Sequence, residues 1–165
     1  MEKQEKTYLD FVRYALSDNA TLLTSLASID WMSFLEFCYR QSIQGVVFGG
    51  IERAGLTIPQ DVLFEWISLV EVTKQTNVTL NRQCAELTGF FAKKGYRSCI
   101  LKGQANAMLY PRPELRSPGD IDIWVKKDGN PNVNDNHNDN KVDEVAEIIR
   151  MVLKKCPDAH YGYHH

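Results

Sequence analysis

The chain has 165 residues, of which 44% are hydrophobic and 24% are charged, and its formal net charge is -2 at pH 7. This composition is typical of a soluble globular protein, and the slightly acidic balance argues against a basic nucleic-acid-binding surface. No apolar run approaches the roughly 20 residues that a transmembrane helix needs. The N-terminal stretch MEKQEKTYLD is polar and lacks the apolar core of a secretory signal, so we expect a cytoplasmic protein.

The first 95 residues are predicted to form a helical region. Apolar residues at three- and four-residue spacing indicate helices over residues 6–17, 31–41 and 43–54. Asp30 occupies the N-cap position of the second helix, and Gly55 follows the third helix as a stop signal. Pro59 lies near the start of a fourth helix, where its missing N–H does no harm.

The fourth helix is the strongest secondary-structure prediction. A heptad-like seam runs over about eight turns and comprises Leu63, Trp66, Val70, Thr73, Asn77, Leu80, Cys84, Leu87 and Phe91. Its two consecutive polar members, Thr73 and Asn77, make the seam weakest at its middle. We expect this helix to pack with the first three helices in one bundle, and dimerisation through the seam is the alternative.

The pattern changes after Gly95. Residues 96–101 are predicted to form a buried strand, residues 104–110 a short helix, and residues 111–118, with their three prolines, an extended loop. Residues 120–125 are predicted to form a second strand, with Ile121, Ile123 and Val125 on one face. The Asn- and Asp-rich segment of about residues 127–140 is expected to be a mobile loop without the spacing of a calcium loop, and residues 142–155 return to helical spacing.

Asp120 and Asp122 are the candidate metal ligands. Residues two apart on a strand project to the same face, so their carboxylates are expected to stand side by side. Two carboxylates this close repel each other unless a cation lies between them, and Mg²⁺ prefers hard oxygen ligands of this kind. The alternative for a D-x-D pattern is a solvated pair of surface carboxylates.

Lys102, Gly103 and Arg116 are the candidate phosphate-binding residues. A strand that ends in Lys102-Gly103 and runs into a helix presents backbone N–H groups to an anion, and the glycine permits close approach of a ligand. Arg116 suits bidentate contact with a phosphate, or, as the alternative, a structural pairing with a nearby carboxylate. The four cysteines, in contrast, show neither C-x-x-C spacing nor a local histidine partner, and we expect reduced thiols rather than a zinc site.

An apolar strand, LKG, a short helix ending in LYP, an arginine and then GDIDIWV follow one another in residues 100–125. This order resembles the uncharacterised bacterial nucleotidyltransferase-like family of the DNA polymerase beta superfamily. The resemblance implies an α+β fold in which a helical N-terminal bundle (residues 1–95) packs on a partial nucleotidyltransferase core with a small mixed sheet (residues 96–165). It implies transfer of a nucleoside monophosphate from an NTP to an acceptor hydroxyl, with two Mg²⁺ ions bound through Asp120 and Asp122.

The chain departs from the superfamily pattern in three places. Lys102-Gly103-Gln104 stands where glycine-serine is usual, so the hydroxyl contact to phosphate is missing, and the gap from Gly103 to Asp120 is longer than the common spacing. The third carboxylate of the superfamily lies on a later strand, whereas Asp158 is the sole carboxylate after the last predicted helix. We therefore expect an N-terminal fragment of a longer protein or a shortened homologue.

Two other functions stay open at this point. One is a catalytically silent nucleotide-binding or protein-interaction module that retains the fold, and the other is a helical partner protein in which the long seam dimerises. The acceptor also stays open among protein hydroxyls, RNA ends, antibiotics and small metabolites, as does the base of the NTP, because specificity of this kind is not encoded in a readable pattern.

Overall fold

A computed structural model describes residues 2–17, 29–128 and 139–155 of the chain. Its helices and strands, in chain order, are α1 (Glu2–Ala15), α2 (Trp31–Arg40), α3 (Gln44–Arg53), α4 (Gln60–Ala92), β1 (Tyr96–Leu101), α5 (Gly103–Ala107), the 3-10 helix η1 (Pro113–Leu115), β2 (Asp122–Lys127) and α6 (Asp139–Lys155). The fold class is α+β, as predicted. The described sheet consists of β1 and β2, which run antiparallel, so it is simpler than the mixed sheet expected.

The chain divides into two compact units, each built from two separate stretches of sequence. One comprises Met1–Leu87 with Ile100–Ile123, and the other comprises Thr88–Cys99 with Trp124–His165. The first unit contains α1, α2, α3, most of α4, α5 and η1, and it also contains every residue proposed above for metal or phosphate binding. The division into a helical region and a nucleotidyltransferase core stays a prediction.

Local chemistry explains where the early helices begin and end. The Asp30 carboxylate accepts hydrogen bonds from the backbone N–H groups of Met32 and Ser33, at 3.2 and 3.3 Å, and from the Ser33 hydroxyl at 2.8 Å. These contacts cap α2 as predicted, and the Ser33 hydrogen bonds lower the pKa of Asp30. Gly55 follows α3 with a φ of 62°, the left-handed conformation expected of a glycine stop signal.

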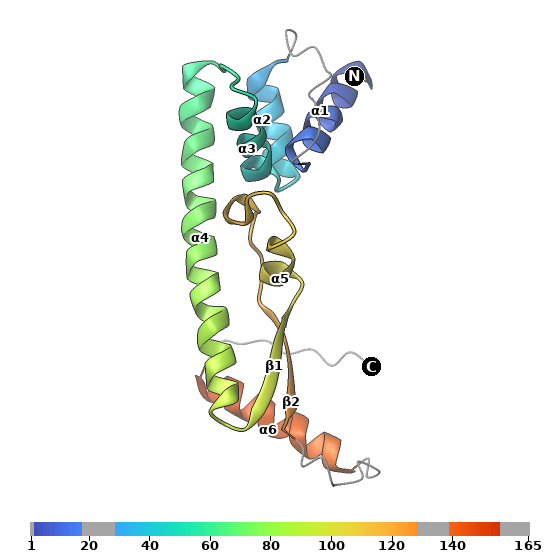
Figure 1. The fold of residues 1–165 in the computed structure, drawn as a ribbon, viewed down its shortest axis with the longest axis vertical. Coiled ribbons are helices and arrows are strands. Elements are labelled where there is room, and N and C mark those ends of the chain that lie inside the picture. Colours follow the sequence, from blue (N-terminus) through green and yellow to red (C-terminus); the bar gives the residue numbers. More distant parts are fainter. Residues whose placement is uncertain (1, 18–28, 129–138, 156–165) are drawn as a thin grey trace. The chain divides into compact units, whose positions relative to one another are not determined.

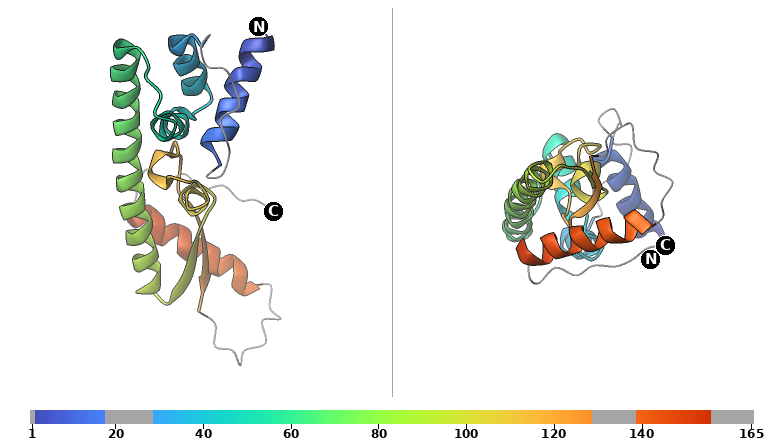
Figure 2. Two further views of the ribbon diagram at one scale, coloured as in Figure 1. Left: turned by 45° about the horizontal axis from the view of Figure 1, so that its top comes forward. Right: turned by 90° about the horizontal axis from the view of Figure 1, so that it is seen from below.

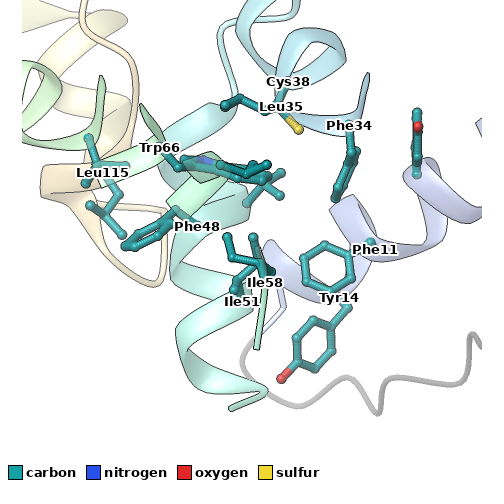
Figure 3. Packing of buried hydrophobic residues seen from close by; sticks show 14 residues of the cluster. Phe11, Tyr14, Phe34, Leu35, Cys38, Phe48, Ile51, Ile58, Trp66 and Leu115 are labelled. Atoms are coloured by element: carbon teal, nitrogen blue, oxygen red, sulfur yellow. The ribbon is translucent and has the colours of Figure 1, made fainter. Parts of the chain in front are cut away.

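The core of the first unit is an aromatic cluster between α1, α2, α3 and the N-terminal half of α4 (Figures 1 and 2). Phe34 lies at its centre, stacked on Tyr8 with ring centroids 4.5 Å apart and edge-on to Trp66 at 6.0 Å. Figure 3 shows Phe11, Phe34 and Trp66 converging with Leu115 of η1 nearby. Phe34 and Trp66 are fully buried, and each contributes on the order of 2–3 kcal/mol through burial.

The seam predicted for α4 is confirmed as the buried stripe of this helix. Trp66, Val70, Thr73, Asn77, Cys84 and Phe91 are all buried, while Leu63, Leu80 and Leu87 are half-buried. The N-terminal part of the seam packs within the bundle, and the indole N–H of Trp66 donates to the carbonyl of Gln44 at 2.8 Å. The polar middle of the seam is buried as well, because Asn77 bonds to chain outside α4, as described below.

The β-strands differ from prediction in the burial of β1 and in the residue at which β2 begins. Burial alternates along β1, from buried Tyr96 to exposed Leu101, so the strand is not buried throughout as predicted. β2 begins at Asp122 rather than at Asp120. The ladder begins at Asp122 because its partner strand β1 ends at Leu101, where Lys102 follows with a φ of 45°.

The remaining elements are close to their predicted positions. α5 begins one residue earlier and ends three residues earlier than predicted, and η1 forms one helical turn within the loop that was expected to be extended. Of the predicted mobile loop, residues 129–138 lie outside the described residues, while Lys127 ends β2 and Asp139 begins α6. Asp158 also lies outside them. Among the described helices, none combines the length and apolarity that crossing a membrane would take.

Candidate functional site

Two segments that are far apart in the sequence meet where β1 ends and β2 begins. The ammonium Nζ of Lys102 lies 3.8 Å from Oδ2 of Asp122. A Cβ added to Gly103 would lie 3.1 Å from the carbonyl oxygen of Asp120, so the two backbones approach more closely than most side chains would allow. Four of the five predicted site residues therefore lie together.

The backbone at Lys102 accounts for this geometry. Lys102 has a φ of 45° and a ψ of -133°, an uncommon conformation for a residue with a side chain. It ends β1 and serves as the N-cap residue of α5, and its carbonyl accepts a hydrogen bond from the N–H of Asn106 at 2.8 Å. Strained backbone of this kind costs about 1–3 kcal/mol and is concentrated at functional sites.

The two aspartates differ in their surroundings. Asp122 is half-buried at the first position of β2, and its side chain is 38% exposed. Asp120 is exposed and precedes the strand, so the prediction that both residues stand on one strand face is wrong. In the part of the chain that the structure describes, the Asp120 carboxylate has no ion pair, while Asp122 pairs with Lys102.

A third acidic ligand is not apparent in residues 2–17, 29–128 and 139–155. Within these ranges, no group of three or more His, Cys, Asp or Glu side chains is placed to hold a metal ion. The chemistry of the two aspartates still fits a divalent cation, because both present hard oxygen donors and Asp120 is exposed without a competing cation beside it. The remaining positions around Mg²⁺ are commonly filled by water and by substrate phosphates.

Arg116 lies in the loop that leads to Asp120. Its guanidinium carbon is 6.0 Å from the ring centroid of Tyr110, and its Nη1 atom is buried without a hydrogen-bond partner. Among the described residues no carboxylate forms an ion pair with Arg116, so the alternative of a structural salt bridge is not seen. Among the described residues, the Arg116 side chain forms no hydrogen bond or ion pair with Asp120 or Asp122.

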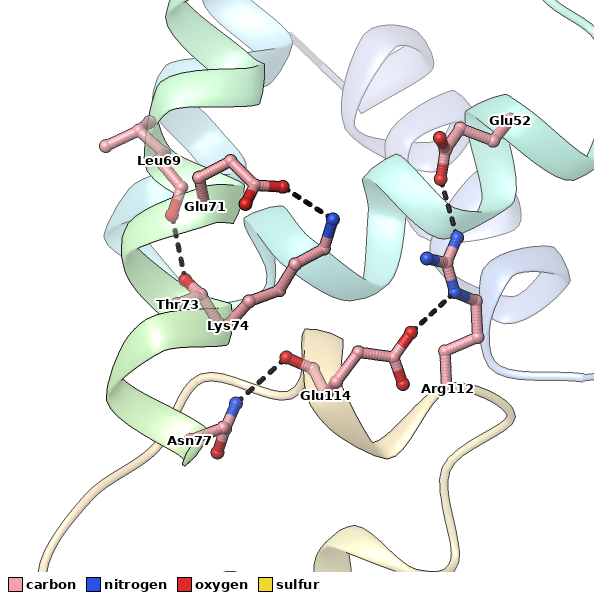
Figure 4. A network of polar contacts seen from close by, with 8 residues as sticks. All are labelled: Glu52, Leu69, Glu71, Thr73, Lys74, Asn77, Arg112 and Glu114. Atoms are coloured by element: carbon pink, nitrogen blue, oxygen red, sulfur yellow. Dashed lines mark hydrogen bonds and ion pairs between the residues drawn. The ribbon is translucent and has the colours of Figure 1, made fainter. Parts of the chain in front are cut away.

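Asn77 is a residue of the site that the sequence did not reveal. Its side-chain Nδ2 donates to the carbonyls of Glu114 and Arg116, at 2.9 and 2.8 Å, and the first of these bonds is drawn in Figure 4. Its Oδ1 accepts from Nε2 of Gln104 at 3.3 Å. Asn77 is 2% exposed, and its hydrogen bonds link α4 to Gln104 of α5 and to the loop that contains Arg116. The signal in the sequence was a polar residue within an apolar seam.

The loop that precedes Asp120 is also held by α3, through contacts at Arg112 and Leu115. Arg112 donates to Glu52 at 2.6 Å and to Glu114 at 2.9 Å (Figure 4). Burial alone would lower the pKa of Arg112, but the hydrogen bonds to Glu114 and Glu52 outweigh it and raise that pKa. Gly45 of α3 lies against the backbone of Leu115, where an added Cβ would be 2.1 Å from the carbonyl oxygen. The loop is therefore fixed at both ends.

A cavity of about 280 Å³ lies beside this loop, between α1, α3 and residues 110–115. Tyr110, Arg112 and Glu52 are among the residues that line it, and none of the five predicted site residues does. This cavity is thus separate from the aspartate and lysine cluster.

Comparison with known proteins identifies a family for most of the chain. The model of a family described as an uncharacterised nucleotidyltransferase matches residues 27–139, which include α2 to β2 and all five predicted site residues. Searches of curated proteins and of solved structures found no match. The match spans more than half of the chain, and the chain therefore belongs to this uncharacterised nucleotidyltransferase family.

Proposed function

We propose that the chain is a magnesium-dependent nucleotidyltransferase that transfers a nucleoside monophosphate from an NTP to an acceptor hydroxyl and releases pyrophosphate. The observation that carries the proposal is the meeting of Lys102-Gly103 with Asp120 and Asp122, across a gap of 16 intervening residues, in a member of a nucleotidyltransferase family. The carboxylates of Asp120 and Asp122 can bind a cation, and the ammonium of Lys102 beside them can bind a phosphate. A metal-bound triphosphate requires both kinds of group.

Asp120 and Asp122 would hold the magnesium. When bound, Mg²⁺ neutralises phosphate charge and activates oxygen nucleophiles. Each aspartate contributes anionic oxygens, and their position at the start of β2 gives Asp122 a rigid support while Asp120 stays accessible. Rigid support for the ligands is what metal-assisted chemistry needs.

Lys102 would bind the phosphates of the NTP. Its side chain is 77% exposed, and an exposed ion pair of this kind contributes less than about 1 kcal/mol. The ammonium is therefore free to leave Asp122 for a phosphate oxygen at little cost. Gly103 keeps the backbone after β1 close to that of Asp120, and Arg116 would supply a second cation from the neighbouring loop.

A thermal-shift experiment tests this proposal. With Mg²⁺ and an NTP at about 100 times the Kd, bound ligand adds about 2.7 kcal/mol, which raises the Tm of a chain of this size by roughly 5–10 °C. The Asp120→Asn/Asp122→Asn variant should lose this shift, whereas the control Asp61→Asn, at an exposed position in the first turn of α4, should keep it.

Two outcomes would count against the proposal. An equal shift in the double variant would remove the metal role of the aspartates. A shift without pyrophosphate release under every acceptor tried would favour the alternative of a catalytically silent nucleotide-binding module.

A further inference from the structure

The cavity of about 280 Å³ beside residues 110–115 has no role in the proposed function. Its lining residues come from the end of α1, from α3 and from residues 110–115, all of which belong to the first compact unit. Small-molecule sites usually enclose roughly 300–1,000 Å³, so a ligand of this cavity would be small.

One part of the cavity wall is apolar. Val46 and Leu115 are buried residues of this part. Gly49 also lines the cavity, and a Cβ added there would lie 2.9 Å from Cδ1 of Leu115 and 3.9 Å from Nη1 of Arg112. The missing side chain at Gly49 therefore leaves space where the apolar part of the wall meets the charged part, and a ligand that uses this space needs an apolar group.

The other part of the wall carries charges of both signs. Arg112 donates from Nη1 to Oε2 of Glu52 at 2.6 Å (Figure 4), and the two side chains are 42% and 49% exposed. Arg53 donates to the hydroxyl and to the carbonyl of Tyr14, and its guanidinium carbon lies 4.4 Å from the centroid of the Tyr14 ring. One carboxylate and two guanidinium groups thus line the same small cavity.

This set of charges favours a ligand that carries both signs. A simple anion would be repelled by the carboxylate of Glu52, and a simple cation would be repelled by the guanidinium groups. Arg112 contacts Oε2 of Glu52, and a carboxylate has further acceptor sites for an ammonium group. The exposed pair of Arg112 and Glu52 contributes little to stability, so these side chains can adjust to a ligand at little cost.

We propose that this cavity binds a free α-amino acid with an apolar side chain. Glu52 would accept hydrogen bonds from the ammonium group of the amino acid, and Arg53 and Arg112 would donate to its carboxylate. Val46 and Leu115 would contact its side chain. The three parts of the ligand therefore match the three kinds of group in the wall.

Calorimetric titration of the full chain with L-leucine and with L-phenylalanine tests the proposal. For each amino acid, the matching carboxylic acid without the amino group and the matching amine without the carboxylate are the comparison probes. The wild type should bind at least one of the two amino acids, and it should bind both single-charge analogues of that amino acid about tenfold more weakly or worse. The reason is that each analogue lacks one set of charge-assisted hydrogen bonds.

Glu52→Gln tests the charge of the wall. Glutamine keeps an oxygen that can accept from Arg112, but it lacks the negative charge for the ammonium group, so amino-acid binding should weaken about tenfold or more. The matched control is Glu36→Gln, because Glu36 also forms an exposed pair with an arginine, Arg40, and does not line the cavity. This control should bind like the wild type.

Gly49→Leu tests the location of the ligand, because the new side chain would occupy the cavity. The atom that it meets first is the end of the Leu115 side chain, which can shift. The folded variant, checked by circular dichroism, should lose amino-acid binding. If the larger residue prevents folding, Glu52→Gln still decides the proposal.

The binding site is independent of the proposed metal site, because neither Asp120 nor Asp122 lines the cavity. Asp120→Asn/Asp122→Asn should therefore bind the amino acid like the wild type, and loss of binding in this variant would overturn the proposal. The absence of binding by the wild type, equal binding of either single-charge analogue, or wild-type affinity in Glu52→Gln or in folded Gly49→Leu would also overturn it.

Discussion

Replacing Asn77 by alanine should destabilise the fold through the loop that carries Arg116. Asn77 is buried in the middle of α4, and its Nδ2 donates to the carbonyls of Glu114 and Arg116. Alanine keeps the helix but removes both donors, so the loop loses its attachment to α4. The substitution therefore tests the contribution of the Asn77 side chain to the attachment of the loop, without breaking α4.

The size of the effect follows from opposing terms. Two neutral hydrogen bonds contribute about 1 kcal/mol each, and acceptors left without a partner in a buried site add to the loss. Alanine is the better helix former and returns about 0.6 kcal/mol. The net loss should be about 1.5–2.5 kcal/mol, which lowers the Tm by roughly 3–10 °C for a chain of this length.

Urea unfolding at 25 °C, followed by circular dichroism, measures this loss. Gln75→Ala is the matched control, because Gln75 is exposed on the same helix and alanine improves helix propensity there as well. If Asn77→Ala were as stable as Gln75→Ala, the inference that Asn77 anchors the loop would be refuted.

Two further predictions concern packing and thiol chemistry. Gly45→Ala should destabilise the bundle by about 1–3 kcal/mol or displace η1, because the new methyl group overlaps the Leu115 carbonyl at 2.1 Å, and a melting curve would show the loss; an unchanged Tm would mean that this contact is looser than the structure indicates. Burial raises the pKa of the Cys38 thiol from 9.0 to about 12, so at pH 8 a thiol reagent should label exposed Cys99 and spare Cys38 in the folded chain. Because the pKa of Cys38 is raised in the folded chain, its contribution to stability is complete below pH 9. It declines between pH 9 and about 12, because the unfolded thiol ionises first in this range. Rapid labelling of Cys38 at pH 8 would contradict its burial.

The helical part of the fold was largely predictable from sequence because its signals are local. Asp30 caps α2 through atoms three residues away or fewer, and the three- and four-residue spacing along α4 depends only on the helix period. The same spacing placed Trp66 and Val70 in the core correctly. What the seam did not reveal was the reason for a polar residue at Asn77, because its partners lie about 40 residues further along the chain.

The site residues stay a prediction, and the local geometry around them was only partly predictable. Alternation of polar and apolar side chains shows which residues share one face of a strand, but it does not show the residue at which the strand begins. The start of β2 at Asp122 depends on where β1 ends, and β1 ends because Lys102 adopts a positive φ. That conformation is rare for a lysine, and no local pattern indicates it.

Binding of a divalent cation by Asp120 and Asp122, together with the phosphates of an NTP, can be measured directly with Mn²⁺. Mn²⁺ is a paramagnetic substitute for Mg²⁺, and electron paramagnetic resonance counts the free ion during a titration. We predict that the wild type removes Mn²⁺ from solution, more tightly when a non-hydrolysable NTP analogue is present, and that Asp120→Asn/Asp122→Asn does neither. Equal Mn²⁺ binding by the wild type and the double variant, with and without the analogue, would contradict it.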